Sequence, residues 1–422
     1  MGGSFVVASS NSNTSAEIRD ASGPDAVEAS GAVEVSADND TGINHIVISG
    51  ALGGGAGIAG MASINLITDT TEAGIYNSQI GSTAARAASV RVAALHSVAV
   101  DSIAGSLGVG LGSAGVGAGA SVNIVKARTL AEIDQSQVFT TGLTEVTATS
   151  DKQVEALAMT AGGGLYGGIG GAAAVTLIGS NVKDEGADEV DSGTLAAADD
   201  FTNGDRGSEL SGGDDVLTAS ERAEINNSTR ADTTGIARGT DATAYTHRTA
   251  ANVSGADSRI DAAGITVQAV DKLHAKSTVG GFGISAGLGA GAGVGVTQVA
   301  ANVDAGVDSG IDLISSGAVL VQAEAQDVSA SDKAIQILAL NGGVGAVGIG
   351  AAVAVGAISN TVNASLGGDV QANDSQVSVT ARDATSLDID AYGAAAGALG
   401  AGAVVATGSK NSTVVARTLA GS

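Results

Sequence analysis

The chain has 422 residues, of which 64 are glycine, one is proline and none is cysteine or tryptophan, and its formal net charge is −25. Without cysteine it forms no disulfide and no cysteine-based metal site, and a single proline excludes a collagen. An acidic chain with few basic residues is poorly suited to bind nucleic acid, which requires clustered Lys and Arg. A mean hydropathy of +0.27, with 44% hydrophobic residues but only 2% aromatics, also excludes a disordered chain.

Repeats are the strongest signal in the sequence. One marker is a triplet of a small, a variable and an aliphatic residue; a second is an alternating V-x-V pattern or a close relative; a third is a glycine-rich tract. The triplets begin at Ala16, Ala73, Ala131, Ala251, Ala305 and Ala364, the alternating patterns at Val33, Val90, Thr144, Ile265, Val319 and Val377, and the tracts lie near Gly53, Gly108, Gly162, Gly280, Gly342 and Gly393. The triplets are 57, 58, 120, 54 and 59 residues apart, so the long interval contains an insertion in addition to one or two repeats.

Each unit predicts strands in a fixed order. In the unit that starts at Val319, an alternating strand over 319–325 precedes a longer, less regular strand over 328–340, the glycine tract and an apolar run over 351–358. Alternation with a period of two, in Val, Ile and Thr, indicates strands. Helices are disfavoured because each interior glycine would cost a helix about 1 kcal/mol.

The glycine tracts predict close contact between sheets. From Gly287 to Gly295, glycine occupies every second position. In a strand these glycines fall on one face, and Leu, Ala and Val fall on the other. A glycine face lets a second sheet approach closely, but it weakens an isolated strand. We therefore expect these strands to be stable only when stacked on their neighbours, as in a solenoid.

The sequence predicts an all-β, elongated β-solenoid (β-helix-like) of 54–59-residue repeats with one acidic insertion. About three repeats occupy residues 1–183, about three occupy residues 250–422, and a loop-rich insertion lies between them at 184–249. Two coil sizes fit such repeats: one wide coil of three or more strands, or three coils of about 19 residues. Exposed strand edges would let units stack head to tail into a filament.

No segment of the sequence has the features of a membrane span or a signal peptide. The best candidate span, 342–358, has 17 residues against the roughly 20 that a helix needs to cross a bilayer, and it lacks Trp or Tyr belts and flanking basic residues. We therefore expect no transmembrane segment. The opening MGGSFVVASSN lacks the basic and long apolar regions of a signal peptide, so we expect Met1 to be an artificial or internal start.

The acidic insertion contains the one metal-site candidate. Residues 184–232 hold 14 Asp and Glu against three Arg, and a short helix is expected over 217–226. Carboxylates in a glycine-punctuated loop suit Ca²⁺, and the candidate ligands are Asp200, Asp205, Glu209, Asp214 and Asp215. Their spacing does not match an EF-hand loop, so a solvated acidic loop is the favoured interpretation and a calcium site is the alternative.

No catalytic motif stands out. The sequence contains no H-E-x-x-H, G-x-S-x-G or phosphate-binding loop, and its four histidines lie at unrelated positions of the repeats. We therefore expect a non-enzymatic protein with no catalytic residue and no cofactor other than Ca²⁺. A carbohydrate-active β-helix enzyme is the alternative, because Asp clusters on the surface of some β-helices cleave acidic polysaccharides.

Two segments carry a family resemblance: GAGASVN at 117–123 with AEIDQSQV at 131–138, and GIGAAVAV at 348–355 leading to Ala364. The order of these motifs resembles the repeats of very large secreted bacterial adhesins of the filamentous haemagglutinin-like and leukotoxin-type families. The resemblance extends over nearly the whole chain outside the insertion. It implies an elongated β-rich stalk, secreted or exposed on a bacterial surface, that serves adhesion, biofilm formation or aggregation. The implied partners are filament neighbours and a host, cell-surface or polysaccharide receptor; a self-assembling extracellular fibre or sheath subunit is the structural alternative.

Overall fold

The computed structural model of the protein describes residues 1–23, 26–179, 248–372 and 375–419. All the named strands belong to one compact unit, which comprises Gly2–Ser180 and His247–Ser422. The described residues form strands and connecting turns without an α-helix, so the all-β prediction is confirmed for this part of the chain. Accordingly, no described helix is long and apolar enough to cross a membrane.

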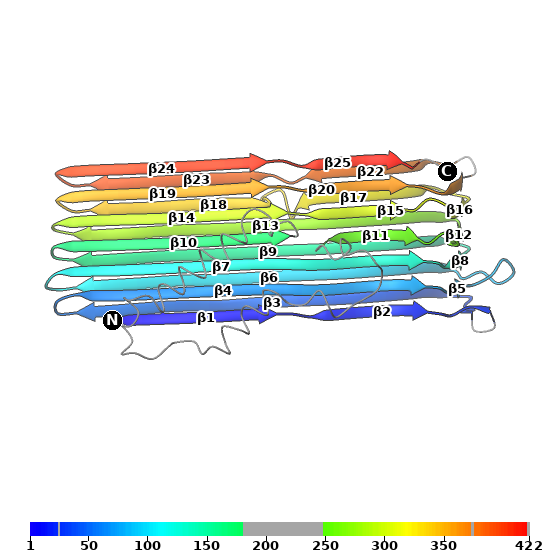
Figure 1. Cartoon of the computed structure of the whole chain (residues 1–422), viewed down its shortest axis with the longest axis horizontal. Helices are drawn as coiled ribbons and strands as arrows, with labels where there is room; N and C mark the ends of the chain where they lie inside the picture. Colours follow the sequence, from blue (N-terminus) through cyan, green and yellow to red (C-terminus); the bar gives the residue numbers. More distant parts are fainter. Residues whose placement is uncertain (24–25, 180–247, 373–374, 420–422) are drawn as a thin grey trace. The chain divides into compact units, whose positions relative to one another are not determined.

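The strands form three sheets, labelled A, B and C, in which neighbouring strands run parallel (Figure 1). Sheet A consists of β1 (Gly2–Ser10), β2 (Asn13–Arg19), β4 (Gly57–Tyr76), β7 (Ala114–Asp134), β10 (Gly167–Gly179), β11 (Thr249–Ser254), β14 (Leu288–Ala300), β15 (Asn302–Val307), β19 (Val347–Ile358), β20 (Thr361–Leu366), β24 (Leu399–Lys410) and β25 (Thr413–Thr418). Sheet B consists of β5 (Gln79–Ile80), β8 (Gln137–Phe139), β12 (Arg259–Ala262), β16 (Asp312–Ser315) and β21 (Asp369–Ala372). Sheet C consists of β3 (Ala32–Gly53), β6 (Ser89–Gly110), β9 (Leu143–Gly164), β13 (Gly264–Ser285), β17 (Val319–Asp327), β18 (Ile335–Val344), β22 (Val377–Ala384) and β23 (Leu387–Ala396).

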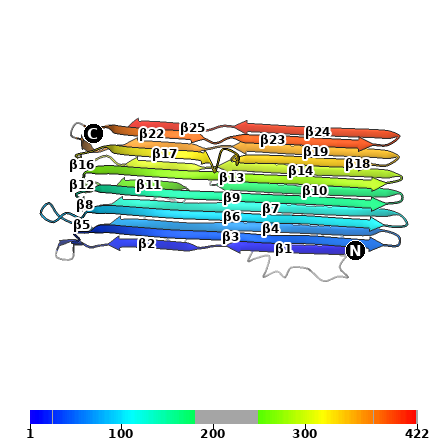
Figure 2. The ribbon, with the colours of Figure 1, turned by 180° about the vertical axis from the view of Figure 1, so that it is seen from behind.

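In each repeat the chain runs along sheet C, turns tightly into sheet A, and passes through sheet B before it returns to sheet C. For example, β13 leads through residues 286–287 into β14 and β15, and then into β16 and β17. The successive repeats lie side by side in the order of the sequence (Figures 1 and 2). The tight turns between sheets C and A lie at the left in Figure 1 and at the right in Figure 2.

Each strand pairs with the equivalent strands of the preceding and following repeats. Paired residues are 52–60 positions apart, or 120–122 positions apart across residues 180–247. The triplet alanines are direct partners: Ala16 with Ala73, Ala73 with Ala131, Ala131 with Ala251, Ala251 with Ala305, and Ala305 with Ala364. The long triplet interval therefore spans one repeat and an insertion. Because partners lie one repeat apart, the pairing matches one wide pass per repeat and not three passes of about 19 residues.

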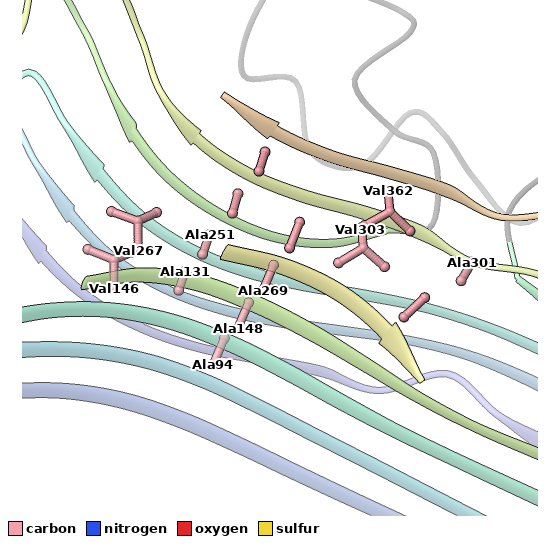
Figure 3. Close-up of a cluster of buried hydrophobic side chains, with 14 of the residues drawn as sticks. Ala94, Ala131, Val146, Ala148, Ala251, Val267, Ala269, Ala301, Val303 and Val362 are labelled. Carbon is pink, nitrogen blue, oxygen red and sulfur yellow. The ribbon is translucent and has the colours of Figure 1, made fainter. Parts of the chain in front are cut away.

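An aliphatic core lies between the sheets in the half of each repeat next to sheet B. The first and third residues of each triplet point inward, as Ala131 and Ile133 do, and the middle residue points outward. Equivalent inward residues form rows across the repeats, such as Ala94, Ala148 and Ala269 on β6, β9 and β13 (Figure 3). A row of this kind has no space for a large ring, because close-packed interiors leave few voids.

Toward the tight turns, glycine replaces this aliphatic core. In β14 every second residue from Gly289 to Gly295 is a buried glycine, while Val294 on the opposite face is exposed. A Cβ atom at Gly291 would lie 2.2 Å from the carbonyl oxygen of Gly281 in sheet C. The prediction that the glycine faces let two sheets approach closely is confirmed.

The second strand of the repeat that starts at β17 begins later than the sequence predicts. β18 starts at Ile335, not at Val328. Between β17 and β18, Ser329 Oγ accepts hydrogen bonds from the backbone N–H groups of Ser331 and Asp332. Such local bonds form a turn and compete with strand pairing, so the prediction of a strand over these residues is wrong.

Some ionisable side chains are buried between the sheets, near the middle of the long strands. Lys152 Nζ lies 2.6 Å from Asp271 Oδ1, and both side chains are almost inaccessible to water. Asp69 Oδ2 accepts a hydrogen bond of 2.7 Å from Thr41 Oγ1 and lies 3.5 Å from His96 Nε2. The pairing satisfies charges that would be costly to bury alone.

The electrostatic environment of Asp69 favours the ionised form. Burial by itself raises the pKa of Asp69, but hydrogen bonds from His96, Thr41 and the backbone N–H of Ser12 outweigh it and lower the pKa to about 2. An unfolded Asp has a pKa of about 3.9. The ionised carboxylate therefore stabilises the fold above about pH 4, and this contribution is lost as the pH falls toward 2.

We expect Asp69→Asn to remove this pH-dependent contribution. Two pKa units correspond to about 2.7 kcal/mol, of which about 2 kcal/mol is lost by pH 2, so the difference in unfolding free energy between wild type and variant should shrink by about 2 kcal/mol from pH 5 to pH 2. Urea unfolding at a series of pH values measures it. The comparison with wild type matters, because protonating the other carboxylates also reduces repulsion in so acidic a chain. Ser36→Ala, on the exposed face of β3, changes no ionisable group and is the control, so it should give a constant difference; a constant difference for Asp69→Asn would contradict the prediction.

Candidate functional site

The predicted calcium ligands lie outside the described residues. Asp200, Asp205, Glu209, Asp214 and Asp215 all fall within 180–247, as does the helix expected over 217–226. β10 ends at Gly179 and β11 begins at Thr249, so nearly all of the proposed insertion falls there too. Among the residues that the structure does describe, no group of three or more His, Asp or Glu side chains is arranged to hold a metal ion. Calcium binding therefore stays a prediction.

A polar hollow of about 410 Å³ lies on the outer face of sheet A, over β7, β11, β15, β20 and β25. Its central residues are direct partners on neighbouring strands: Glu132, Asn252, Gly306, Ser365 and Arg417. All five are middle or equivalent outward positions of the triplets, so period-two alternation directs their side chains away from the core. The hollow is thus built from five successive repeats.

Gly306 lowers the floor of the hollow. It stands between Asn252 and Ser365, both of which carry side chains. A Cβ atom at Gly306 would lie 3.2 Å from Asn252 Oδ1 and 3.4 Å from Ser365 Oγ. These two polar groups therefore flank a gap where a side chain is missing.

The walls of the hollow carry paired charges and hydrogen-bonding groups. Arg248 Nη1 lies 3.8 Å from Asp304 Oδ2, and Asn363 Nδ2 donates a hydrogen bond of 3.2 Å to Asp304 Oδ1. On the other side, Ser254 Oγ lies 2.9 Å from Glu132 Oε1. Both donors and acceptors face the same space, which suits a ligand with hydroxyl or amide groups.

Two carboxyl groups that line the hollow have raised pKa values, so they ionise less readily than ordinary Asp and Glu side chains. Burial raises the pKa of Glu132, and the hydrogen bond from Ser254 offsets this only in part. Burial, followed by the charge of Asp134, raises the pKa of Asp308. Carboxyl groups with raised pKa occur at binding and catalytic sites, but they also occur in structural networks.

Sequence reasoning missed this hollow, although a signal for it was present. Once the repeats are aligned by their triplets, the middle residues form one row across sheet A: Glu17, Gly74, Glu132, Asn252, Gly306 and Ser365. The row shows that these residues share a face. It does not show which of them is recessed, because recession depends on the neighbouring side chains.

The chain matches no protein-family model, no curated protein and no solved structure.

Proposed function

We propose that the chain is a non-enzymatic structural region of a secreted or surface-exposed bacterial adhesin, folded as a β-solenoid with one wide coil per repeat. The observation that supports this most strongly is the register: equivalent residues of successive repeats are direct partners in three parallel sheets. Stability in such an array comes from contacts between neighbouring repeats. The structural alternative, a fibre or sheath subunit, is supported by the open edges at the ends of the sheets, such as β24, whose described partner is β19 alone.

Adhesion would result from many weak contacts on broad faces. Strands of neighbouring repeats lie about 4.8 Å apart, so a repeat of more than fifty residues adds only that distance along the stacking direction. Adding repeats to such a stalk therefore increases its length only slowly, while each repeat makes it broad and stiff. Several chains side by side, each presenting a polar site such as the hollow on sheet A, would then bind a receptor by avidity.

Force spectroscopy tests the coil size. If each repeat is one coil, pulling the chain from its ends should release segments of about 57 residues, each adding about 200 Å of contour length. Steps of one third of that length would indicate three small coils per repeat. A single release of the whole chain would argue against a repeat array.

A bead assay tests the function. Beads coated with the purified chain are expected to adhere to surfaces that carry bacterial or host polysaccharides and to aggregate with one another, and heat-unfolded chain should do neither. Addition of Ca²⁺ or a chelator tests whether the predicted calcium binding affects adhesion. Failure of folded chain to adhere or aggregate at any coating density would contradict the proposal.

Turnover of polysaccharide would instead support the enzyme alternative. The hollow offers the specific residue for this test, because Glu132 is a half-buried carboxyl group with a raised pKa. We expect no release of reducing or unsaturated sugars from acidic polysaccharides by the wild-type chain. Release that Glu132→Gln abolishes, while the fold is kept, would replace the structural proposal with a catalytic one.

A further inference from the structure

A second surface, on the outer face of sheet C, lies at the other end of the strands from the polar hollow. In each repeat, the end of the sheet C strand, the tight turn and the start of the sheet A strand lack Asp, Glu, Lys and Arg. Such charge-free stretches span residues 41–68, 102–125, 277–303 and 334–368. In a chain with 44 acidic residues, uncharged stretches of this length are a distinct feature.

The glycine layer forces the apolar side chains of these stretches outward. The inward positions are glycine or small residues because sheets A and C approach closely there, so the large aliphatic residues occupy the opposite face. The exposed side chains on the outer face of sheet C include Ile46, Ile48, Leu52, Leu107, Ile284 and Val344. Of these, Ile48 is 70% exposed and Leu107 is 51% exposed. Single exposed aliphatic residues are ordinary, but a contiguous set on one face marks an interaction site.

This face, made of residues 46–53 and their partners in β6, β9, β13 and β18, is named the sheet C apolar face. Outward glycines allow side chains from neighbouring repeats to lie flat along it. The Sδ atom of Met159 occupies the space next to Gly280, and the ring of Phe282 does the same at Gly342. The face is therefore broad and level, which suits packing against another sheet.

The area of the sheet C apolar face fits a second copy of the chain. Five strands about 4.8 Å apart and eight residues of about 3.3 Å each give about 600 Å² per copy, or about 1,200 Å² for a pair. That total reaches the size of a specific protein–protein interface. A twofold pairing of the face with itself would make contacts that both copies share.

Charge also favours a second copy over a lipid surface. Two chains of net charge −25 repel one another except where both surfaces are uncharged, and the sheet C apolar face contains no ionised group. It likewise contains no Lys or Arg to attract anionic lipids. The backbone groups at the edge of β3 would also lose their hydrogen bonds to water within a bilayer.

We infer that the sheet C apolar face is a self-association surface, which packs face to face against the same surface of a second copy. This goes beyond the proposed adhesive role, because it assigns a lateral contact that is separate from the polar hollow and from the open sheet edges.

Sedimentation velocity over a range of concentrations tests the inference. Wild-type chain is expected to dimerise, and Ile48→Asp or Leu107→Asp should weaken dimerisation at least tenfold by placing a charge in the contact. Both residues are exposed, so circular dichroism and thermal unfolding should match those of wild type. Ile349→Asp is the matched control: it places the same charge on an exposed aliphatic position of β19, on the outer face of sheet A, and should leave dimerisation unchanged.

Three outcomes would overturn the inference. They are a wild-type chain that stays monomeric at the highest concentration, folded Ile48→Asp and Leu107→Asp variants that dimerise as wild type does, and an equal loss of dimerisation in Ile349→Asp. Flotation with neutral phosphatidylcholine vesicles tests the alternative, in which the sheet C apolar face binds a lipid surface. Vesicle binding by a monomeric wild-type chain that Leu107→Asp abolishes would assign the face to lipid.

Discussion

Gly170→Val is expected to lower the free energy of unfolding by about 4 kcal/mol. Gly170 lies on the inward face of β10, where even a Cβ atom would be 2.3 Å from the carbonyl oxygen and 2.6 Å from the backbone nitrogen of Phe282. Backbone atoms cannot move aside as a flexible side chain can. The substitution therefore has to separate sheets A and C locally, and the separation disturbs the neighbouring repeats as well.

The adjacent residue provides a matched control. Gly171 is on the outward face of the same strand, and a Cβ atom there meets nothing within 4 Å. Gly171→Val should be neutral or stabilise the protein by up to about 1 kcal/mol, since a β-branched residue favours the strand and reduces the freedom of the unfolded chain. Urea unfolding of the two variants measures the difference. Equal effects at Gly170 and Gly171 would mean that the two sheets are not in backbone contact.

Val321→Asp is expected to destabilise the fold by more than about 4 kcal/mol. Val321 is fully buried on β17, between its partners Val267 on β13 and Val379 on β22. A carboxylate at this position would have no charged partner, and its protonated form would still lose its hydrogen bonds to water. Because neighbouring repeats support each other, we expect faster hydrogen exchange in β13 and β22 as well as in β17.

Gln322→Asp is the control for Val321→Asp. It introduces the same carboxylate one residue later, on the outward face of β17. It removes the hydrogen bond that Gln322 donates to Glu324, so it should cost about 1 kcal/mol, far less than Val321→Asp. Thermal or urea unfolding of both variants gives the comparison. An unfolding curve for Val321→Asp that matches wild type would be inconsistent with an inward Val321.

Pairing register could be predicted closely from the repeats. The triplet at Ala131 and the triplet at Ala251 are separated by 120 residues in the chain, yet their alanines are direct partners. The strand type followed from period-two alternation, and the inward face of the glycine tracts followed from the same alternation. The prediction that was wrong concerns one short segment. A turn at Ser329 replaces the start of a predicted strand, because hydrogen bonds between the Ser329 side chain and the backbone compete with strand pairing.

The candidate site was less accessible to sequence reasoning. The aspartate clusters of the sequence indicate a site in the acidic insertion, and the calcium ligands proposed there remain a prediction. The polar hollow combines residues from five repeats, and its depth comes from the missing side chain at Gly306. No single segment contains that pattern, since each repeat contributes between one and four of the residues.

The sequence by itself determined that strands form, which face of each strand is inward, and which residues of successive repeats are equivalent. These properties are set by alternation and periodicity along the chain, which are local and repeated. Only the tertiary structure decided that each repeat makes one wide pass, that glycine faces from sheets A and C meet, and that Ile48 and Leu107 are consequently exposed. The physical reason is that the alternation of a strand defines two faces but does not specify the distance to the opposite sheet; packing between sheets sets that distance.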